Sequence, residues 1–174
     1  MISNKPYAVV VIVMVAVAGI ITTSSLGVLP HPVNTPLTRS VVDQLGGLEF
    51  TMTLKNTTFK IGEQINITFT VTNIGYQTIS YALSFPEFDF IVYNSSNSQL
   101  YRWTSFKMFP MIVMEMDLLP GDNRTSILAW RQTCNQSESN NEGIQVSPGQ
   151  YYIVGRYVRL GLSTSPLQLS IVSG

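Results

Sequence analysis

Strict alternation of apolar and polar residues is the feature that most constrains how this chain can fold. Residues 65–72 read Ile-Asn-Ile-Thr-Phe-Thr-Val-Thr, so every second side chain is apolar. Successive side chains of a β-strand point to opposite faces of a sheet, and the pattern therefore predicts a strand with one buried and one solvated face. Residues 48–54 and 167–171 alternate in the same way.

Turn signals separate these runs. Clusters of Pro, Gly and Asn recur at intervals of roughly 8–15 residues, and no helical period follows residue 47. Further strands are predicted at residues 78–85, 88–93, 99–109, 111–119, 126–131 and 151–160, while residues 41–47 are an ambiguous approach strand. This spacing predicts an all-β fold, an antiparallel β-sandwich, after an N-terminal hydrophobic helix.

Residues 88–109 are the predicted centre of the sandwich. Two runs rich in aromatic and β-branched residues flank a cluster of Asn and Ser at 94–98, a pattern typical of a β-hairpin with a longer loop. The alternation places Phe88, Phe90 and Val92 on one face of the first arm, and Glu87, Asp89 and Ile91 on the other.

An apolar leader precedes the strands. After Lys5, residues 7–21 are almost wholly Val, Ile, Ala and Met. With the residues up to 29 the run has about 23 residues at about 1.5 Å each, enough for a helix that anchors the protein in a membrane. Alternatively the leader is a signal peptide, with Thr23 and Ser25 at the −3 and −1 positions of a cleavage site.

Both interpretations predict that the chain leaves the cytoplasm after about residue 30. The predicted organisation is an anchor or signal peptide at 1–29, a proline-containing linker at 30–47 and a β-sandwich domain at 48–174. Residues 7–29 are the predicted membrane contact.

Composition limits the chemistry. The formal net charge is zero and 11% of the residues are charged, so no nucleic-acid partner is expected. His31, the single histidine, lies in the linker, and Cys134 is the single cysteine. We therefore expect no catalytic residue, metal site, cofactor or intramolecular disulfide, and no enzyme activity. Cys134 is expected to be a free thiol, with a bridge between two chains as the alternative.

Two pairs of carboxylates, Glu87 with Asp89 and Glu115 with Asp117, are each spaced to share one face of a strand. Such a pair is suited to acid–base hydrolysis or to calcium binding. More often it lies on a solvated face or protects a sheet edge, which is the interpretation we favour.

Five Asn-X-Ser/Thr sequons are candidates for N-glycosylation. They begin at Asn56, Asn66, Asn94, Asn123 and Asn135. Four of them fall in predicted turns or loops, where Asn and Ser also serve turn formation alone. Together with the leader they favour a glycoprotein outside the cytoplasm.

Short motifs recur in order between residues 48 and 160. They are Phe88-Asp89-Phe90, Trp103, Lys107, Phe109, Pro120-Gly121-Asp122, Trp130 and Pro148-Gly149-Gln150-Tyr151. In their order and spacing the chain resembles the intracellular proteinase inhibitor family, the BsuPI-like domain. Two positions depart from that family, because Thr104 replaces a Ser and Phe106 replaces a Gly, which makes the hairpin bulkier.

The resemblance implies an immunoglobulin-like (Ig-like) β-sandwich that binds protein, with inhibition of a protease as the function of the family. Its intracellular target does not carry over, because the leader predicts an external domain. The candidate protein-binding residues are Arg102, Trp103, Phe106, Lys107 and Phe109. Trp103 and Phe109 are expected in the core, where they anchor the hairpin. The alternative is a contact patch formed by Arg102, Phe106 and Lys107, and the two can hold together.

Two classes of function stay open. The first is an extracytoplasmic, membrane-anchored module that binds protein and blocks the cleft of a protease without being turned over. The second is an assembly subunit of a surface layer, pilus or envelope complex, in which sheet edges pair to form homo-oligomers. A hydrolase that uses the carboxylate pairs ranks third.

Overall fold

The structure is a computed structural model that describes residues 39–134 and 143–174, with residues 39–45 described by their backbone alone. In this part of the chain there are fourteen strands and no helix. The strands are β1 (Arg39–Leu45), β2 (Leu48–Leu54), β3 (Thr58–Lys60), β4 (Ile65–Asn73), β5 (Ile79–Ser84), β6 (Phe88–Asn94), β7 (Gln99–Arg102), β8 (Val113–Leu118), β9 (Asn123–Trp130), β10 (Thr133–Cys134), β11 (Ile144–Gln145), β12 (Gly149–Tyr157), β13 (Leu162–Ser163) and β14 (Leu167–Val172).

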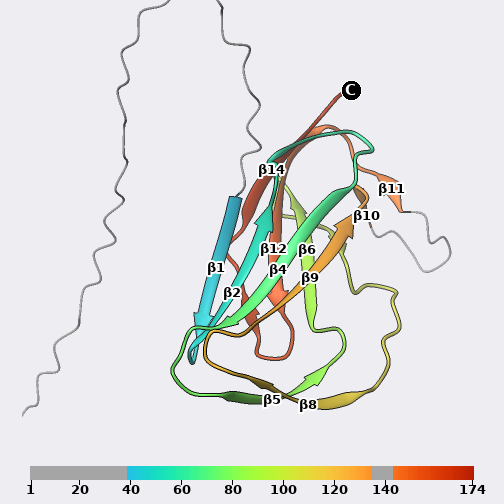
Figure 1. Ribbon diagram of the computed structural model, residues 1–174. Coiled ribbons are helices and arrows are strands. Elements are labelled where there is room, and N and C mark those ends of the chain that lie inside the picture. The colour runs from blue at the N-terminus through green and yellow to red at the C-terminus, as the bar shows by residue number, and fades with distance from the viewer. Residues whose placement is uncertain (1–38, 135–142) are drawn as a thin grey trace, which may run out of the picture. The chain divides into compact units, whose positions relative to one another are not determined.

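Two sheets stack face to face (Figure 1). One has the strand order β1-β2-β4-β9 and is antiparallel throughout. The other has the order β3-β14-β12-β6-β7, with β13 beside β12, and is antiparallel except where β14 pairs with β3. The pair β5 and β8 forms a separate ribbon at one end of the sandwich, and β10 pairs with β11 (Figure 1).

The core lies between the two sheets and includes the apolar residues that the alternation predicted in β2, β4 and β14. All four apolar side chains of β4 are fully buried, whereas its Thr side chains are partly exposed and Asn66 is exposed. Phe69 of β4 contacts Phe50 in its own sheet at a ring-centroid distance of 6.0 Å, and it meets Phe88 and Phe90 of the opposite sheet at 5.9 and 6.3 Å. These rings join the two layers, and burying them contributes much of the free energy that holds the sandwich together.

The predicted all-β fold is confirmed for the described residues. β2 has the predicted bounds, 48–54, and β4, β5, β9, β12 and β14 overlap their predicted ranges. The ambiguous residues 41–47 mostly belong to β1, which pairs with β2. The predicted N-terminal helix and residues 135–142 lie outside the described residues.

The central hairpin is present, but its second arm is shorter than predicted. β7 ends at Arg102, although the aromatic run to residue 109 predicted a longer strand. The backbone N–H of Ser105 donates to the carbonyl of Arg102 (3.1 Å), and that of Lys107 donates to the carbonyl of Thr104 (3.3 Å). Phe106 has φ of +59°, in the left-handed region. The chain therefore turns away from the sheet directly after β7.

Candidate protein-binding surface

Asp89 ties this turn to the sheet. Its side chain is fully buried. Oδ1 accepts hydrogen bonds from the backbone N–H groups of Phe90 (2.8 Å) and Thr104 (3.2 Å). Oδ2 accepts from the Thr104 hydroxyl (2.9 Å) and from Nε of Arg102 (2.7 Å). One carboxylate thus fixes both the end of β7 and the first residues of the turn against β6.

Glu87 makes the second ion pair of this region. Nε and Nη2 of Arg124 donate to its two carboxylate oxygens at 2.8 and 3.1 Å. Arg124 belongs to β9, in the opposite sheet, so this bidentate pair links the two layers. The hydrogen bond to Glu87 raises the pKa of Arg124 above its usual value.

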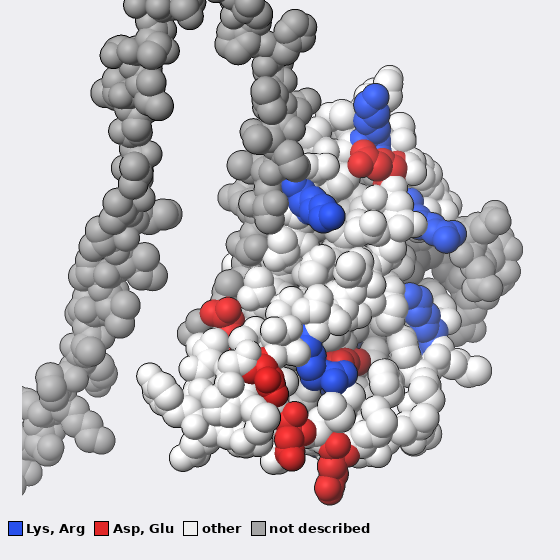
Figure 2. Space-filling model, in the orientation of Figure 1, with Lys and Arg blue, Asp and Glu red and all other residues white. Residues whose placement is uncertain are grey.

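The prediction that Glu87 and Asp89 lie on a solvated face or a protective edge is wrong. Both are buried, because an arginine from a later segment pairs with each carboxylate. Ile91, on the same predicted face, is also buried. Glu115 and Asp117, in contrast, are exposed on β8, as predicted. Figure 2 shows acidic side chains gathered at the end of the sandwich that carries β5 and β8.

Trp103 organises the residues that follow the Asp89 anchor. Its backbone N–H donates to the carbonyl of Phe90 (3.0 Å). Its ring packs against the core and lies 5.6 Å from that of Phe109, while Nζ of Lys107 lies 3.6 Å from its centroid, a cation–π contact. Partial burial lowers the pKa of Lys107, an effect that the charge of Asp89 opposes.

Exposed apolar side chains follow this cluster in an almost continuous run. Met108 and Met111 are about fully exposed, at 97% and 102%, and Phe106 is 57% exposed. Ile112, Val113 and Met114 extend the run into β8. We call residues 103–114 the contact segment. An apolar run of this kind on a folded surface is typical of a binding site, and flexible methionines suit a surface that must adapt to a partner.

A small hollow adjoins the start of the contact segment. It has a volume of about 130 Å³, and Trp103, Phe109, Phe85 and Leu128 contribute to its lining. Phe85 is itself 41% exposed. The hollow is large enough for an apolar side chain of a partner, though not for a whole ligand.

The five predicted binding residues are brought together on this surface, in different settings. Phe106 and Lys107 are exposed, and Trp103 and Phe109 are partly buried. Arg102 is held by Asp89, and 40% of its side chain is exposed. Sequence reasoning missed Met108 and the apolar residues at 111–114, because the pattern at 111–119 predicts a strand with a carboxylate face. Met108, Met111 and Met114 gave no usable signal, because methionine is ordinarily a core residue.

The sequons occupy several places on the sandwich. Asn56 lies between β2 and β3, Asn66 is exposed on the outer face of β4, and Asn94 ends β6. Asn123 begins β9 and is exposed, while Asn135 lies outside the described residues. Glycosylation at these positions stays a prediction.

The described residues contain no group of three or more His, Cys, Asp or Glu side chains that is placed to hold a metal ion. Cys134 is a partly buried free thiol whose Sγ donates to the carbonyl of Ile144 (3.4 Å). No helix within 39–134 or 143–174 is long and apolar enough to cross a membrane. The predicted anchor and His31 lie outside these ranges.

A family model described as intracellular proteinase inhibitor (BsuPI) matches residues 52–159. No curated protein matches the chain. Among solved structures, a mutant β-glucosidase from Listeria innocua is 12% identical with a TM-score of 0.43, over 72% of this chain and 16% of that one. The CARDB domain of a Pyrococcus furiosus protein, in complex with di-metal ions, is 13% identical with a TM-score of 0.40, over 77% of this chain and 96% of that one. The chain thus spans about a sixth of the length of the β-glucosidases that it matches.

Proposed function

The chain belongs to the intracellular proteinase inhibitor family, and we propose that it is a protein-binding module that inhibits a protease through residues 103–114. The single observation that carries this proposal is the exposed apolar contact segment. It begins at a rigid anchor, the Asp89 hydrogen bonds and the Trp103 cluster, and it then presents Phe106, Met108 and Met111 to solvent.

Inhibition needs a surface that binds in a cleft and is not turned over. The Asp89 anchor reduces the conformational entropy that the segment loses on binding. Phe106 and the methionines supply the apolar area that is buried in the complex, and Lys107 and Arg102 supply charges beside it. A protease with an apolar, partly acidic cleft is therefore the partner we infer.

We further propose an Ig-like topology for the sandwich. The neighbours β2, β4 and β9 follow the order of strands A, B and E in an immunoglobulin domain, and β6, β12 and β14 follow the order of C, F and G.

We also propose that residues 7–29 hold the domain at the outer face of a membrane. The apolar leader and the sequons support this location, while the family's name points to an intracellular one. Intact-mass measurement on protein purified from its native membranes tests the proposal. We expect a mass that includes residues 1–29 and glycan increments. An unmodified full-length mass, recovered from the cytosol, would contradict it.

The inhibitor proposal is tested by titrating the full-length chain against the secreted and membrane proteases of its host. We expect stoichiometric and reversible loss of peptide hydrolysis by at least one protease, with the chain intact in the complex by mass spectrometry. Cleavage of the chain by each protease, or undiminished hydrolysis at a molar excess of the chain, would sink the proposal.

A second candidate function, assembly between copies, is favoured by one observation. β9 lies at the edge of its sheet, and Ile127 on this strand is 64% exposed. An open edge can pair with a strand of another chain. Light scattering of the purified chain distinguishes the candidates. Assembly predicts that the measured mass rises with protein concentration. The Ile127→Lys variant should then have the mass of the monomer at every concentration.

A further inference from the structure

A second hollow lies on the outer face of the β3-β14-β12-β6-β7 sheet, and it shares no lining residue with the contact segment. Its volume is about 530 Å³, within the range of ligand sites. None of its lining residues carries a charge. We call this hollow the tyrosine groove. The lining residues that the argument uses are Tyr93, Asn94, Ser95, Asn97, Tyr152 and Pro166.

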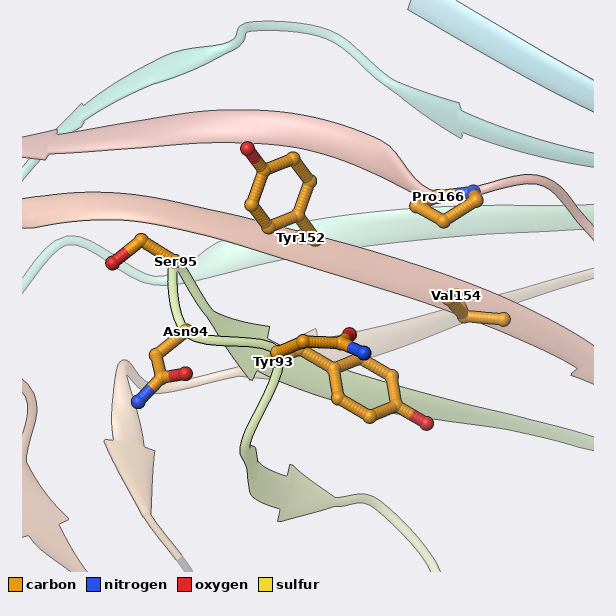
Figure 3. Close-up of a pocket in the computed structure, with 7 residues that line it drawn as sticks. Tyr93, Asn94, Ser95, Tyr152, Val154 and Pro166 are labelled. Carbon is orange, nitrogen blue, oxygen red and sulfur yellow. The ribbon is translucent and has the colours of Figure 1, made fainter.

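Two tyrosines from adjacent strands dominate this groove. Tyr93 of β6 and Tyr152 of β12 are direct partners in the antiparallel pairing, so their side chains leave the sheet on the same face. Both are partly exposed. Figure 3 shows their rings turned apart, with Val154 and Pro166 further along the groove. In the described part of the chain neither hydroxyl makes a hydrogen bond. The groove therefore offers ring faces and free polar groups together.

The β6–β7 loop forms a fixed wall of the groove. The backbone N–H of Asn94 donates to the carbonyl of Ser98 (3.0 Å), and that of Asn97 donates to the carbonyl of Asn94 (3.0 Å). Oδ1 of Asn94 accepts from the N–H groups of Ser96 (3.0 Å) and Ser98 (2.8 Å). Asn97 has φ of +59°, so its carboxamide is presented from a fixed left-handed turn.

Outside the lining itself, uncharged polar side chains continue along the same face of the sheet. Gln168 pairs with Tyr152 across β14 and β12, and its Nε2 donates to Oε1 of Gln150 (3.0 Å). Nε2 of Gln150 in turn donates to the hydroxyl of Ser170 (2.8 Å). Amides and hydroxyls, each able to donate and accept, thus lie beside the tyrosine rings.

We propose that this groove binds a neutral saccharide. A sugar ring has an apolar C–H face, which packs on an aromatic ring, and a rim of hydroxyls, which both donate and accept hydrogen bonds. The tyrosine faces match the first property, and the hydroxyls and carboxamides match the second. No lining cation is present to favour a phosphate or a carboxylate, so an uncharged sugar is the ligand that fits this chemistry.

Two sources can supply such a sugar. Asn94 lies in the groove lining and begins the sequon Asn94-Ser95-Ser96, so a glycan attached there would be within reach. A polysaccharide from outside the chain is the other source. Ser96→Ala removes the sequon but keeps Asn94 and the two hydrogen bonds that its Oδ1 accepts from backbone N–H groups, so this variant separates the two sources.

The test uses the full-length chain, produced without N-glycosylation and held in a detergent that has no sugar headgroup. Isothermal titration with maltotriose, cellotriose, mannotriose and triacetylchitotriose measures binding. We expect one saturable site for at least one of these sugars, with a Kd on the order of 1 mM or tighter. Tyr93→Ala and Tyr152→Ala should each weaken binding about tenfold or more, because each removes a ring.

Matched variants keep the result specific. Tyr76→Ala removes a 98% exposed tyrosine outside the groove and should leave binding unchanged. Tyr93→Phe and Tyr152→Phe keep the ring and should retain most of the affinity, even where an Ala variant fails to fold. The same titration is then repeated with glycosylated native protein. If the Asn94 glycan is the natural occupant, added sugar should bind only to the Ser96→Ala variant. If the sugar comes from elsewhere, it should bind to the glycosylated natural chain as well.

The proposal is overturned if none of the four sugars binds the unglycosylated chain. It is equally overturned if binding is indifferent to both Ala variants in folded protein. A synthetic peptide of the proline-rich residues 30–36 is titrated in parallel, because aromatic grooves also bind such peptides. Binding of this peptide at the tyrosines, in place of the sugars, would likewise overturn it.

Discussion

Asp89 is the residue on which the geometry of the contact segment depends most directly. Asp89→Asn keeps the shape of the side chain but removes its charge and places an N–H₂ opposite donors from Arg102 or Thr104. Because Arg102 remains partly solvated, we expect a loss of about 2–3 kcal/mol in the free energy of unfolding, less than for a fully buried pair. Urea unfolding measures it.

Asp117→Asn is the matched control for Asp89→Asn. Asp117 accepts a hydrogen bond from the Ser80 hydroxyl (2.6 Å) on the exposed β5–β8 ribbon. The change should cost no more than about 0.5 kcal/mol. Equal losses for the two variants would show that Asp89 has no special anchoring role.

Tyr157 links a buried hydroxyl to the pH dependence of stability. It is fully buried, and in the described structure neither its hydroxyl nor that of Tyr81 has a hydrogen-bond partner. Burial raises the pKa of Tyr157 above its ordinary value of 10.0, and the neighbouring Tyr81 and Glu87 add to this increase. Above about pH 10 the unfolded chain therefore loses a proton that the folded chain keeps, and stability falls as the pH rises toward the folded-state pKa.

Tyr157→Phe removes both the buried hydroxyl without a partner and the group whose pKa is raised. At pH 7 the variant should be as stable as the natural chain or more stable by up to about 1 kcal/mol, because no hydrogen bond is lost. Between about pH 10 and 11 its stability should fall less steeply, with a residual slope from Tyr101 and Tyr151, whose pKa values burial also raises. Thermal unfolding across this range measures the slope. An unchanged slope, or a large loss at pH 7, would contradict the account.

At the scale of elements, β12 approaches the opposite sheet closely at Gly155. A Cβ at this position would lie 2.8 Å from Cε1 of Phe69 and 3.0 Å from Sδ of Met52. Gly155→Ala should therefore lower the free energy of unfolding by about 1–3 kcal/mol through overpacking. Gly149→Ala, in the same strand, has no neighbour nearer than 3.8 Å and should change it by about 0.5 kcal/mol or less. Chemical denaturation of both variants compares them, and equal stabilities would contradict the packing.

The sequence predicted strands well where burial alone decides the pattern. β2 and β4 each bury every second residue, so period two identified them. The alternation failed to predict the burial in β6. Both faces of this strand are buried, because Arg102 and Arg124, which are distant in sequence, pair with the carboxylates on and beside it. The sequence pattern also failed after β7, because aromatic content does not report the turn that Asp89 fixes.

The candidate site was only partly predicted, because exposure too depends on tertiary contacts. The motif around Trp103 and Lys107 indicated the region, yet the exposure of Met108 and Met111 is a tertiary property. Methionine is ordinarily a core residue, so its presence at 108–114 gave no reason to expect a surface. The tyrosine groove depends on cross-strand register, which pairs Tyr93 with Tyr152 and is not read from either strand alone.

At the scale of the whole molecule, the sandwich presents two separate surfaces. The contact segment is largely apolar and follows a charged anchor, whereas the groove on the β6–β12 face is lined by uncharged residues. The glycans predicted at Asn66 and Asn123 would project from the opposite sheet, to which β4 and β9 belong. We expect one partner to bind at each surface without excluding the other.

The most direct test of the central claim compares inhibition constants for the target protease. The full-length chain is titrated as the natural sequence, as Met108→Asp with Met111→Asp, and as Tyr76→Asp, which alters an equally exposed residue outside the contact segment. If residues 103–114 enter the protease cleft, the double variant should weaken inhibition about 100-fold or more, because two charges lose their hydration in the complex, while Tyr76→Asp should leave it unchanged. Equal inhibition constants for all three proteins would contradict the account.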